Sequence, residues 1–189
     1  MSKQQTGIAG EFWFCSQLHR LGYEAYITLG NTKSVDISLN LNNETILTFD
    51  VKSKINFSAD YQYLNISKRK NHFAVFVNLN TNKDKSGKII FDELGNPIEP
   101  LCYILKSGDI DNIAFQWSEK GNGFRANYLK YLKHQDETNI TDNNKKQFKE
   151  RHPKNLLNGE IDFAFYNKII WTLEDFENAY HKYKEKQKI

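Results

Sequence analysis

The stretch VDISLNLNNETILTFDVKSK, residues 35–54, contains two runs in which apolar and polar residues alternate. The first run is Val35–Leu41 and the second is centred on Leu47–Val51. Because successive side chains of a β-strand point to opposite faces, this alternation predicts two strands that each bury one face. The Asn42-Asn43 pair between them is typical of a turn, so the two strands are expected to pair antiparallel.

The sequence on either side predicts both helices and strands. Apolar residues at three- and four-residue steps predict a helix over residues 6–21, ended by Gly22. The nearly continuous apolar run FAVFVNL at residues 73–79 predicts a strand buried on both faces. The other predicted elements are strands at 24–29 and 101–105, a helix from Ser107 or Asp109 to about Trp117, and a helix at 172–186 with a capping box of Thr172 and Asp175.

These elements predict a mixed α/β (α+β) fold: an N-terminal helix, a three-stranded meander, a helix with further strands, and a C-terminal helix. Residues 1–117 are expected to form the core. Residues 118–189 are expected to be a C-terminal extension packed on the same domain. Within it, residues 118–159 are rich in Lys, Asn, Asp and Glu, which predicts long polar surface loops around one short element near Tyr128–Leu132.

The overall composition describes an ordinary globular chain. Its 189 residues are 39% hydrophobic and carry a formal net charge of +3, which permits a nucleic-acid partner without requiring one. The two cysteines, Cys15 and Cys102, show no zinc or disulfide spacing. No apolar run approaches the ~20 residues that span a bilayer, and the N-terminus lacks the apolar region of a signal peptide. A cytoplasmic protein with reduced thiols and no membrane partner is expected.

Four charged residues stand where the patterns expect partly buried positions. Glu11 falls within the apolar arc of the first helix, where a carboxylate is costly unless it is paired or binds a metal. Asp50 and Lys52 share one face of the strand TILTFDVKSK. Asp36 lies on the polar face of the preceding strand, so pairing through the turn would bring it close to Asp50.

Two or three carboxylates are the usual protein contribution to a Mg²⁺ site, because this hard cation prefers oxygen ligands. Such an ion activates water and neutralises charge on a phosphodiester, and a neighbouring lysine can position the attacking water. The four residues therefore predict a phosphodiester-hydrolysing site. Each residue alone has an ordinary structural explanation, such as a surface ion pair or a turn cap; their shared register favours a site.

Together these residues resemble the PD-(D/E)XK nuclease superfamily. The matching features are Gly7-x-x-Gly10-Glu11 on the first helix, then Asp36, then Asp50-Val51-Lys52. The GxxGE opening is similar in particular to the branch of Holliday-junction resolvases and restriction-endonuclease-like proteins. The likeness covers roughly residues 6–117. It departs at Val35, which stands where the superfamily's name has proline.

The resemblance implies a restriction-endonuclease-like core and a Mg²⁺-dependent (or Mn²⁺-dependent) nuclease, with DNA endonuclease as the expected activity. It implies that Glu11, Asp36 and Asp50 are metal ligands and that Lys52 completes the catalytic set. Paired sites in a homodimer would suit the cleavage of two strands.

Several basic residues are candidate contacts to nucleic-acid phosphates. Lys54 shares the face of Asp50 and Lys52 by alternation. The other candidates are Lys33, Lys68, Arg69 and Lys70, although a basic run of this kind is also typical of a solvated loop.

Two other functions remain open at this point. The first is a catalytically inactive nuclease-fold module that binds nucleic acid or protein. The second is a structural protein that uses its aromatic C-terminal helix as an interface. The five histidines show no metal spacing and are given no role.

Overall fold

The structure is a computed structural model, and it describes residues 2–28, 35–55, 60–61, 66, 68–79, 88, 91, 93–94, 99–113, 115–118, 121–137 and 140–183. At 60–61, 115–118 and 121–127 it describes the backbone alone. The sequence prediction of Lys33 as a phosphate contact therefore lies outside the described residues.

The first half of the chain builds a five-stranded sheet with the strand order β1-β2-β3-β5-β6. Its elements are α1 (Lys3–Arg20), β1 (Glu24–Ile27), β2 (Ile37–Asn42), β3 (Thr45–Lys54), β5 (His72–Asn78) and β6 (Leu101–Lys106). All neighbouring strands are antiparallel except β3 and β5, which are parallel. The mixed α/β fold, the N-terminal helix and the three-stranded meander are confirmed.

The second half of the chain is mainly helical. Its elements are η1 (Ser107–Asn112), β7 (Phe115–Ser118), β8 (Gly121–Arg125), α2 (Ala126–His134), α3 (Asp142–Arg151), η3 (Pro153–Asn155), β9 (Leu156–Leu157), β10 (Glu160–Ile161), α4 (Phe163–Ile169), α5 (Leu173–Tyr180) and η4 (His181–Tyr183). The short strand β4 (Asp60–Tyr61) pairs with β8, which in turn pairs with β7.

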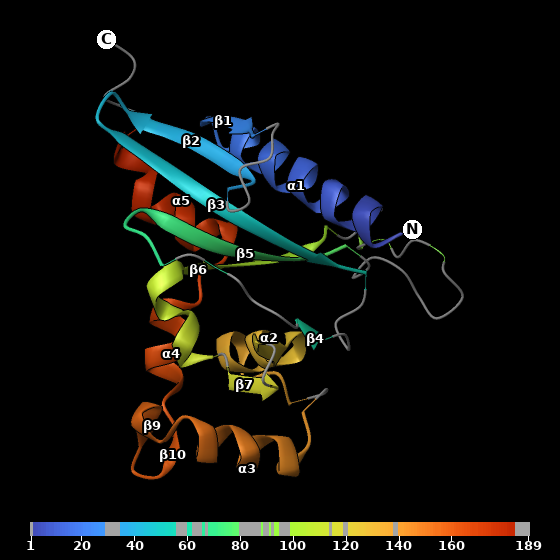
Figure 1. Ribbon diagram of the computed structural model, residues 1–189, viewed down its shortest axis with the longest axis vertical. Coiled ribbons are helices and arrows are strands. Elements are labelled where there is room, and N and C mark those ends of the chain that lie inside the picture. Colours follow the sequence, from blue (N-terminus) through green and yellow to red (C-terminus); the bar gives the residue numbers. More distant parts are fainter. Residues whose placement is uncertain are drawn as a thin grey trace.

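Apolar side chains cover both faces of the sheet. On one face, Phe14 of α1 and Phe176 of α5 pack against Phe49 of β3. On the other face, Ala74 and Phe76 of β5 lie in a cluster with residues of α2, α3 and α4. Figure 1 shows α1 along one side of the sheet and the α2, α3 and α4 region on the other side. Every residue of β5 is buried, as predicted for a strand covered on both faces.

The apolar residues that recur at helical spacing in α1 are Ile8, Phe12, Cys15 and Leu18, and of these only Cys15 and Leu18 are buried. Ile8 is 45% exposed and Phe12 is 59% exposed, whereas Gly10 and Phe14 are buried. A Cβ atom at Gly10 would lie 1.6 Å from Ser53 Oγ, so α1 crosses β3 at closer range than any side chain at this position permits. This close approach rotates the helix so that its Gly10 face, rather than its Phe12 face, meets the sheet.

Two sequence predictions about the second half are wrong. The helix expected up to about Trp117 is a 3₁₀ turn that stops at Asn112 and is followed by a strand. Within residues 118–159, α2 corresponds to the short element expected near Tyr128–Leu132, whereas α3 lies where only polar loops were expected, because its one buried apolar residue, Phe148, stands among polar ones. The terminal helix begins as predicted, with its Thr172–Asp175 capping box present; α5 ends at Tyr180 and continues as the 3₁₀ turn η4 to Tyr183, and the predicted residues 184–186 lie outside the described residues.

Among the described residues, no helix combines the length and the apolar character that crossing a membrane requires.

Candidate functional site

Asp36 is fixed at the point where β2 begins. Its backbone N–H donates to the Phe49 carbonyl at 2.8 Å, and its side-chain Oδ2 accepts from the Val51 N–H at 2.7 Å. Because Ile37 pairs with Phe49 in the antiparallel register, the preceding residue, Asp36, comes to lie beside Asp50. The two predicted carboxylates therefore meet at one end of the β2–β3 ladder.

Asp50 and Lys52 form an ion pair on one face of β3. The Asp50 side chain is only 5% exposed, whereas the Lys52 side chain is 36% exposed. A carboxylate this deeply buried needs a charged or hydrogen-bonding partner, and Lys52 supplies one from the solvent side.

Glu11 enters from α1. The close contact between Gly10 and Ser53 holds this turn of the helix against β3. Burial raises the pKa of the Glu11 carboxyl, the charge of Asp36 raises it further, and Asp50 adds to the effect, while the Lys52 ammonium lowers it. The predicted helical carboxylate therefore lies within electrostatic reach of the other three groups.

The same balance of charges governs Asp36. Burial raises the pKa of the Asp36 carboxyl, and Asp50 raises it again through its charge and a side-chain hydrogen bond. The Val51 N–H and the Lys52 ammonium oppose this rise. Asp36 and Asp50 thus lie together beside the Lys52 ammonium, with Glu11 within electrostatic reach, and added positive charge would stabilise such an arrangement.

The side chains of this cluster could supply only some of the ligands that a metal ion needs. Among the residues that the structure describes, no group of three or more His, Cys, Asp or Glu side chains is arranged to hold a metal ion. Mg²⁺ at phosphate-processing sites is usually held by one or two carboxylates, with water and substrate oxygens supplying the remainder. The carboxylates of Asp36 and Asp50 are adjacent and supply oxygen atoms of the type that Mg²⁺ prefers.

The candidate phosphate contacts are not all in one place. Lys54 lies on β3 and is half-buried, and Lys68 forms an ion pair with Asp111. Arg69 and Lys70 line a pocket of about 460 Å³ at the start of β5. Lys106 of β6 lines the same pocket, because the pairing of β5 with β6 places Lys106 opposite Phe73.

Sequence reasoning gave His72 no role, yet the structure places it between this pocket and the carboxylate cluster. His72 is 1% exposed, and its Nδ1 shares a hydrogen bond of 2.8 Å with Thr48 Oγ1. Its Nε2 has no hydrogen-bond partner among the described groups. Burial lowers the pKa of His72, as does the nearby charge of Arg69, whereas Asp36 raises it. A histidine opening an apolar strand was the only sequence signal for this position.

Comparisons of the chain with protein-family models, with curated proteins and with solved structures find no match. The chemistry of the described residues therefore carries the functional assignment.

Proposed function

We propose that Glu11, Asp36, Asp50 and Lys52 form a nuclease site that uses Mg²⁺ or Mn²⁺ to hydrolyse phosphodiester bonds of nucleic acid. DNA is the proposed substrate. The observation that supports this most strongly is the meeting of Asp36 and Asp50 at the end of the β2–β3 ladder, with Lys52 paired to Asp50. Glu11 joins them from a different element, which a chance ion pair on one strand would not explain.

Each residue has a distinct part in this proposal. Glu11, Asp36 and Asp50 would hold the divalent ion directly or through water. The ion, when bound, supplies charge neutralisation on the phosphate and makes a bound water more acidic. In hydrolysis the water oxygen forms a bond to phosphorus, and the bond from phosphorus to one bridging oxygen breaks, so that this oxygen leaves with a proton. The Lys52 ammonium is a hydrogen-bond donor that would orient the attacking water and face the phosphate charge.

The test is nicking of supercoiled plasmid DNA by the full chain with Mg²⁺ and, separately, with EDTA. We expect Asp50→Ala and Lys52→Ala to lose activity by about 100-fold or more, since each removes a group that acts on the reacting phosphate. Lys146→Ala, which removes an exposed lysine from α3, is the matched control and should cleave as the wild type does. Equal cleavage by the wild type, Asp50→Ala and Lys52→Ala would show that the activity comes from elsewhere.

A second candidate function is a non-catalytic module that binds nucleic acid or protein. It is favoured by the Asp50–Lys52 ion pair, which already compensates the most buried carboxylate of the cluster without a metal. Calorimetry separates the two candidates: the nuclease proposal expects Mn²⁺ uptake that Asp36→Asn weakens, whereas DNA binding without metal uptake would favour the module. A homodimer and a cytoplasmic location remain predictions.

A further inference from the structure

The pocket at the start of β5 has an excess of positive charge. Arg69, Lys70 and Lys106 line it, and the one carboxylate among its described lining residues is Asp109. The pKa of Asp109 is raised by burial and lowered by Lys106, so this carboxylate and this ammonium lie close together. Lys70 and Lys106 against this one carboxylate leave an excess of positive charge, which suits an anionic ligand.

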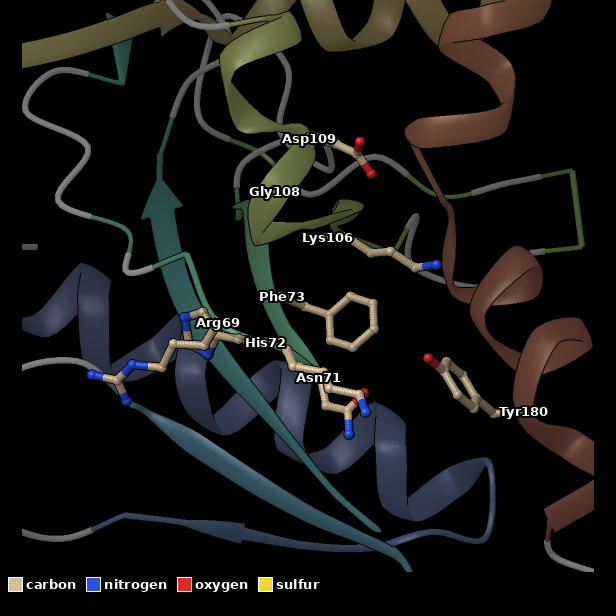
Figure 2. Close-up of a pocket in the computed structure, with 9 residues that line it drawn as sticks. Arg69, Asn71, His72, Phe73, Lys106, Gly108, Asp109 and Tyr180 are labelled. Atoms are coloured by element: carbon tan, nitrogen blue, oxygen red, sulfur yellow. The ribbon is translucent and has the colours of Figure 1, made fainter.

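The walls of the pocket are of two kinds. Phe73 and Lys106 are paired across β5 and β6 and lie on one face of the sheet, where Tyr180 of α5 packs edge-on against Phe73 with ring centroids 6.3 Å apart. Figure 2 shows Lys106, Phe73 and Tyr180 on one side of the strand and Arg69 extending from its other side. The pocket thus combines cationic groups with an aromatic wall.

The segment before β5, residues 69–71, is held in place by hydrogen bonds between the Arg69 backbone and Ser107. Ser107 Oγ accepts from the Arg69 N–H at 3.1 Å and is also within hydrogen-bond distance of the Arg69 carbonyl. Asn71 then adopts a left-handed conformation with φ of 60°, which turns the chain into β5. Because the Arg69 backbone is anchored to η1 in this way, the segment that carries Lys70 is held at the edge of the pocket.

We propose that this pocket binds the phosphomonoester of a nucleotide, with the base or sugar against Tyr180. A phosphomonoester carries about −1.5 to −2 charge at pH 7, so the ammonium groups of Lys70 and Lys106 are favourable partners for it. A volume of about 460 Å³ lies within the range of small-ligand sites. The ligand is a strand terminus or a free mononucleotide, which share this chemistry.

The pocket lies near the carboxylate cluster along the sheet. His72 lines the pocket and pairs with Thr48, two residues before Asp50 on β3. Phe73 and Lys106 lie on the opposite face of the sheet from Asp50, because side chains alternate along a strand and Asp50 pairs with Ala74. Phosphate binding in the pocket therefore does not depend on the proposed nuclease function.

The experiment measures binding by fluorescence anisotropy in EDTA, with the full chain and a short labelled single strand that ends in a 5′-phosphate or a 5′-hydroxyl. The same pair is made for the 3′ end. We expect at least one phosphorylated end to bind about tenfold more tightly than its hydroxyl form. The double variant Lys70→Ala/Lys106→Met should remove that preference; methionine keeps an unbranched chain over Trp171, where Lys106 Nζ lies 5.2 Å from the ring centroid.

The control is Lys146→Ala/Lys168→Ala, which removes two exposed lysines from α3 and α4 and should keep the preference. Lys70→Ala alone changes an exposed side chain and keeps the test valid if the double variant fails to fold. Competition by a mononucleotide would support the pocket with a free nucleotide as its ligand, and competition by phosphorylated strands alone would support a strand terminus. No preference for phosphate in the wild type, or its equal loss in the control, would overturn the proposal.

The two proposals fail separately. Asp50→Asn should abolish hydrolysis and leave the phosphate preference intact. A wild-type chain that prefers phosphorylated ends but cleaves nothing would contradict only the proposed nuclease function. Cleavage that depends on Asp50, without any phosphate preference, would contradict only the pocket.

Discussion

The side chain of Asp36 accepts a hydrogen bond from the Val51 N–H at 2.7 Å and so ties the start of β2 to the middle of β3. The carboxylate is at once a structural acceptor and a neighbour of Asp50. These two roles respond differently to substitution, which makes Asp36 the most informative position of the cluster.

Asp36→Asn keeps an oxygen that can accept from Val51 but removes the charge that faces Asp50 and Glu11. In metal-free protein at pH 7 we therefore expect the free energy of unfolding to stay the same or to rise. Asp36→Ala leaves the Val51 N–H without its partner and should lose about 1–3 kcal/mol. Denaturant unfolding in EDTA measures both. A larger loss for Asn than for Ala would contradict this account of the hydrogen bond.

Lys52→Met leaves the Asp50 carboxylate buried without its ion-pair partner, so we expect a clear loss of stability in EDTA. The double variant Asp50→Asn/Lys52→Met removes both charges and should recover much of that loss. Urea unfolding of the two single variants and the double variant gives the coupling free energy between the two groups. Additive effects would mean that the pair contributes nothing to the fold.

Gly10→Ala should destabilise the protein by about 1–3 kcal/mol, because the new methyl group would overlap Ser53 and push α1 from β3. Gly7→Ala is the matched control on the same helix. No atom lies within 4 Å of a Cβ at Gly7, so the gain in helix propensity should raise stability by up to about 1 kcal/mol. Thermal unfolding followed by circular dichroism compares them. Stabilisation by both substitutions would refute the close approach of α1.

Asp175 should make the protein sensitive to acid. Partial burial alone would raise the pKa of Asp175, but the hydrogen bonds from Lys133 and Thr172 outweigh burial and lower the pKa below its ordinary value. A lowered folded-state pKa contributes stability above the unfolded-state value of about 4, and this stability is lost as the pH falls further. Asp175→Asn should flatten that acid dependence in unfolding experiments between about pH 6 and pH 3.

The partner of Asp175 in the capping box gives an independent check. Thr172→Ala removes the side-chain oxygen that accepts from the Asp175 N–H and should lower the free energy of unfolding by about 1 kcal/mol at neutral pH.

An acid dependence that is identical in the wild type and Asp175→Asn would show that the interactions of Asp175 with Thr172 and Lys133 do not stabilise the folded state.

The sheet was predictable because its strands carry their own pattern. Alternation in residues 35–54 and the continuous apolar run of β5 report burial on one face and on two faces, respectively. The second half carries a weaker signal. Phe148 is the one buried residue of α3, and nine largely polar neighbours hide it from any test of periodicity. Ser107 resembles a helix cap, yet its hydroxyl bonds to Arg69 and no side chain caps η1.

In the carboxylate cluster, the positions of Asp36, Asp50 and Lys52 could be predicted because the pairing register of β2 and β3 fixes them. Asp50 and Lys52 share a face by alternation, and the Asn42-Asn43 turn sets Asp36 beside them. The pocket could not be derived in this way. Lys106 and Lys70 line the same pocket because β5 pairs with β6 and Ser107 contacts the Arg69 backbone, and both interactions join segments far apart in the sequence. Similarly, the exposure of Phe12 follows from the contact between Gly10 and Ser53 and not from the helix alone.

The central claim is that Asp36 and Asp50, with Glu11 and Lys52 around them, take up a divalent cation. Anomalous diffraction from crystals of the protein soaked in Mn²⁺ tests it most directly. The account predicts a manganese peak within coordination distance of the Asp36 and Asp50 carboxylates, which Asp36→Asn crystals soaked in the same way lack. A peak only at other carboxylates, or none at saturating Mn²⁺, would contradict it.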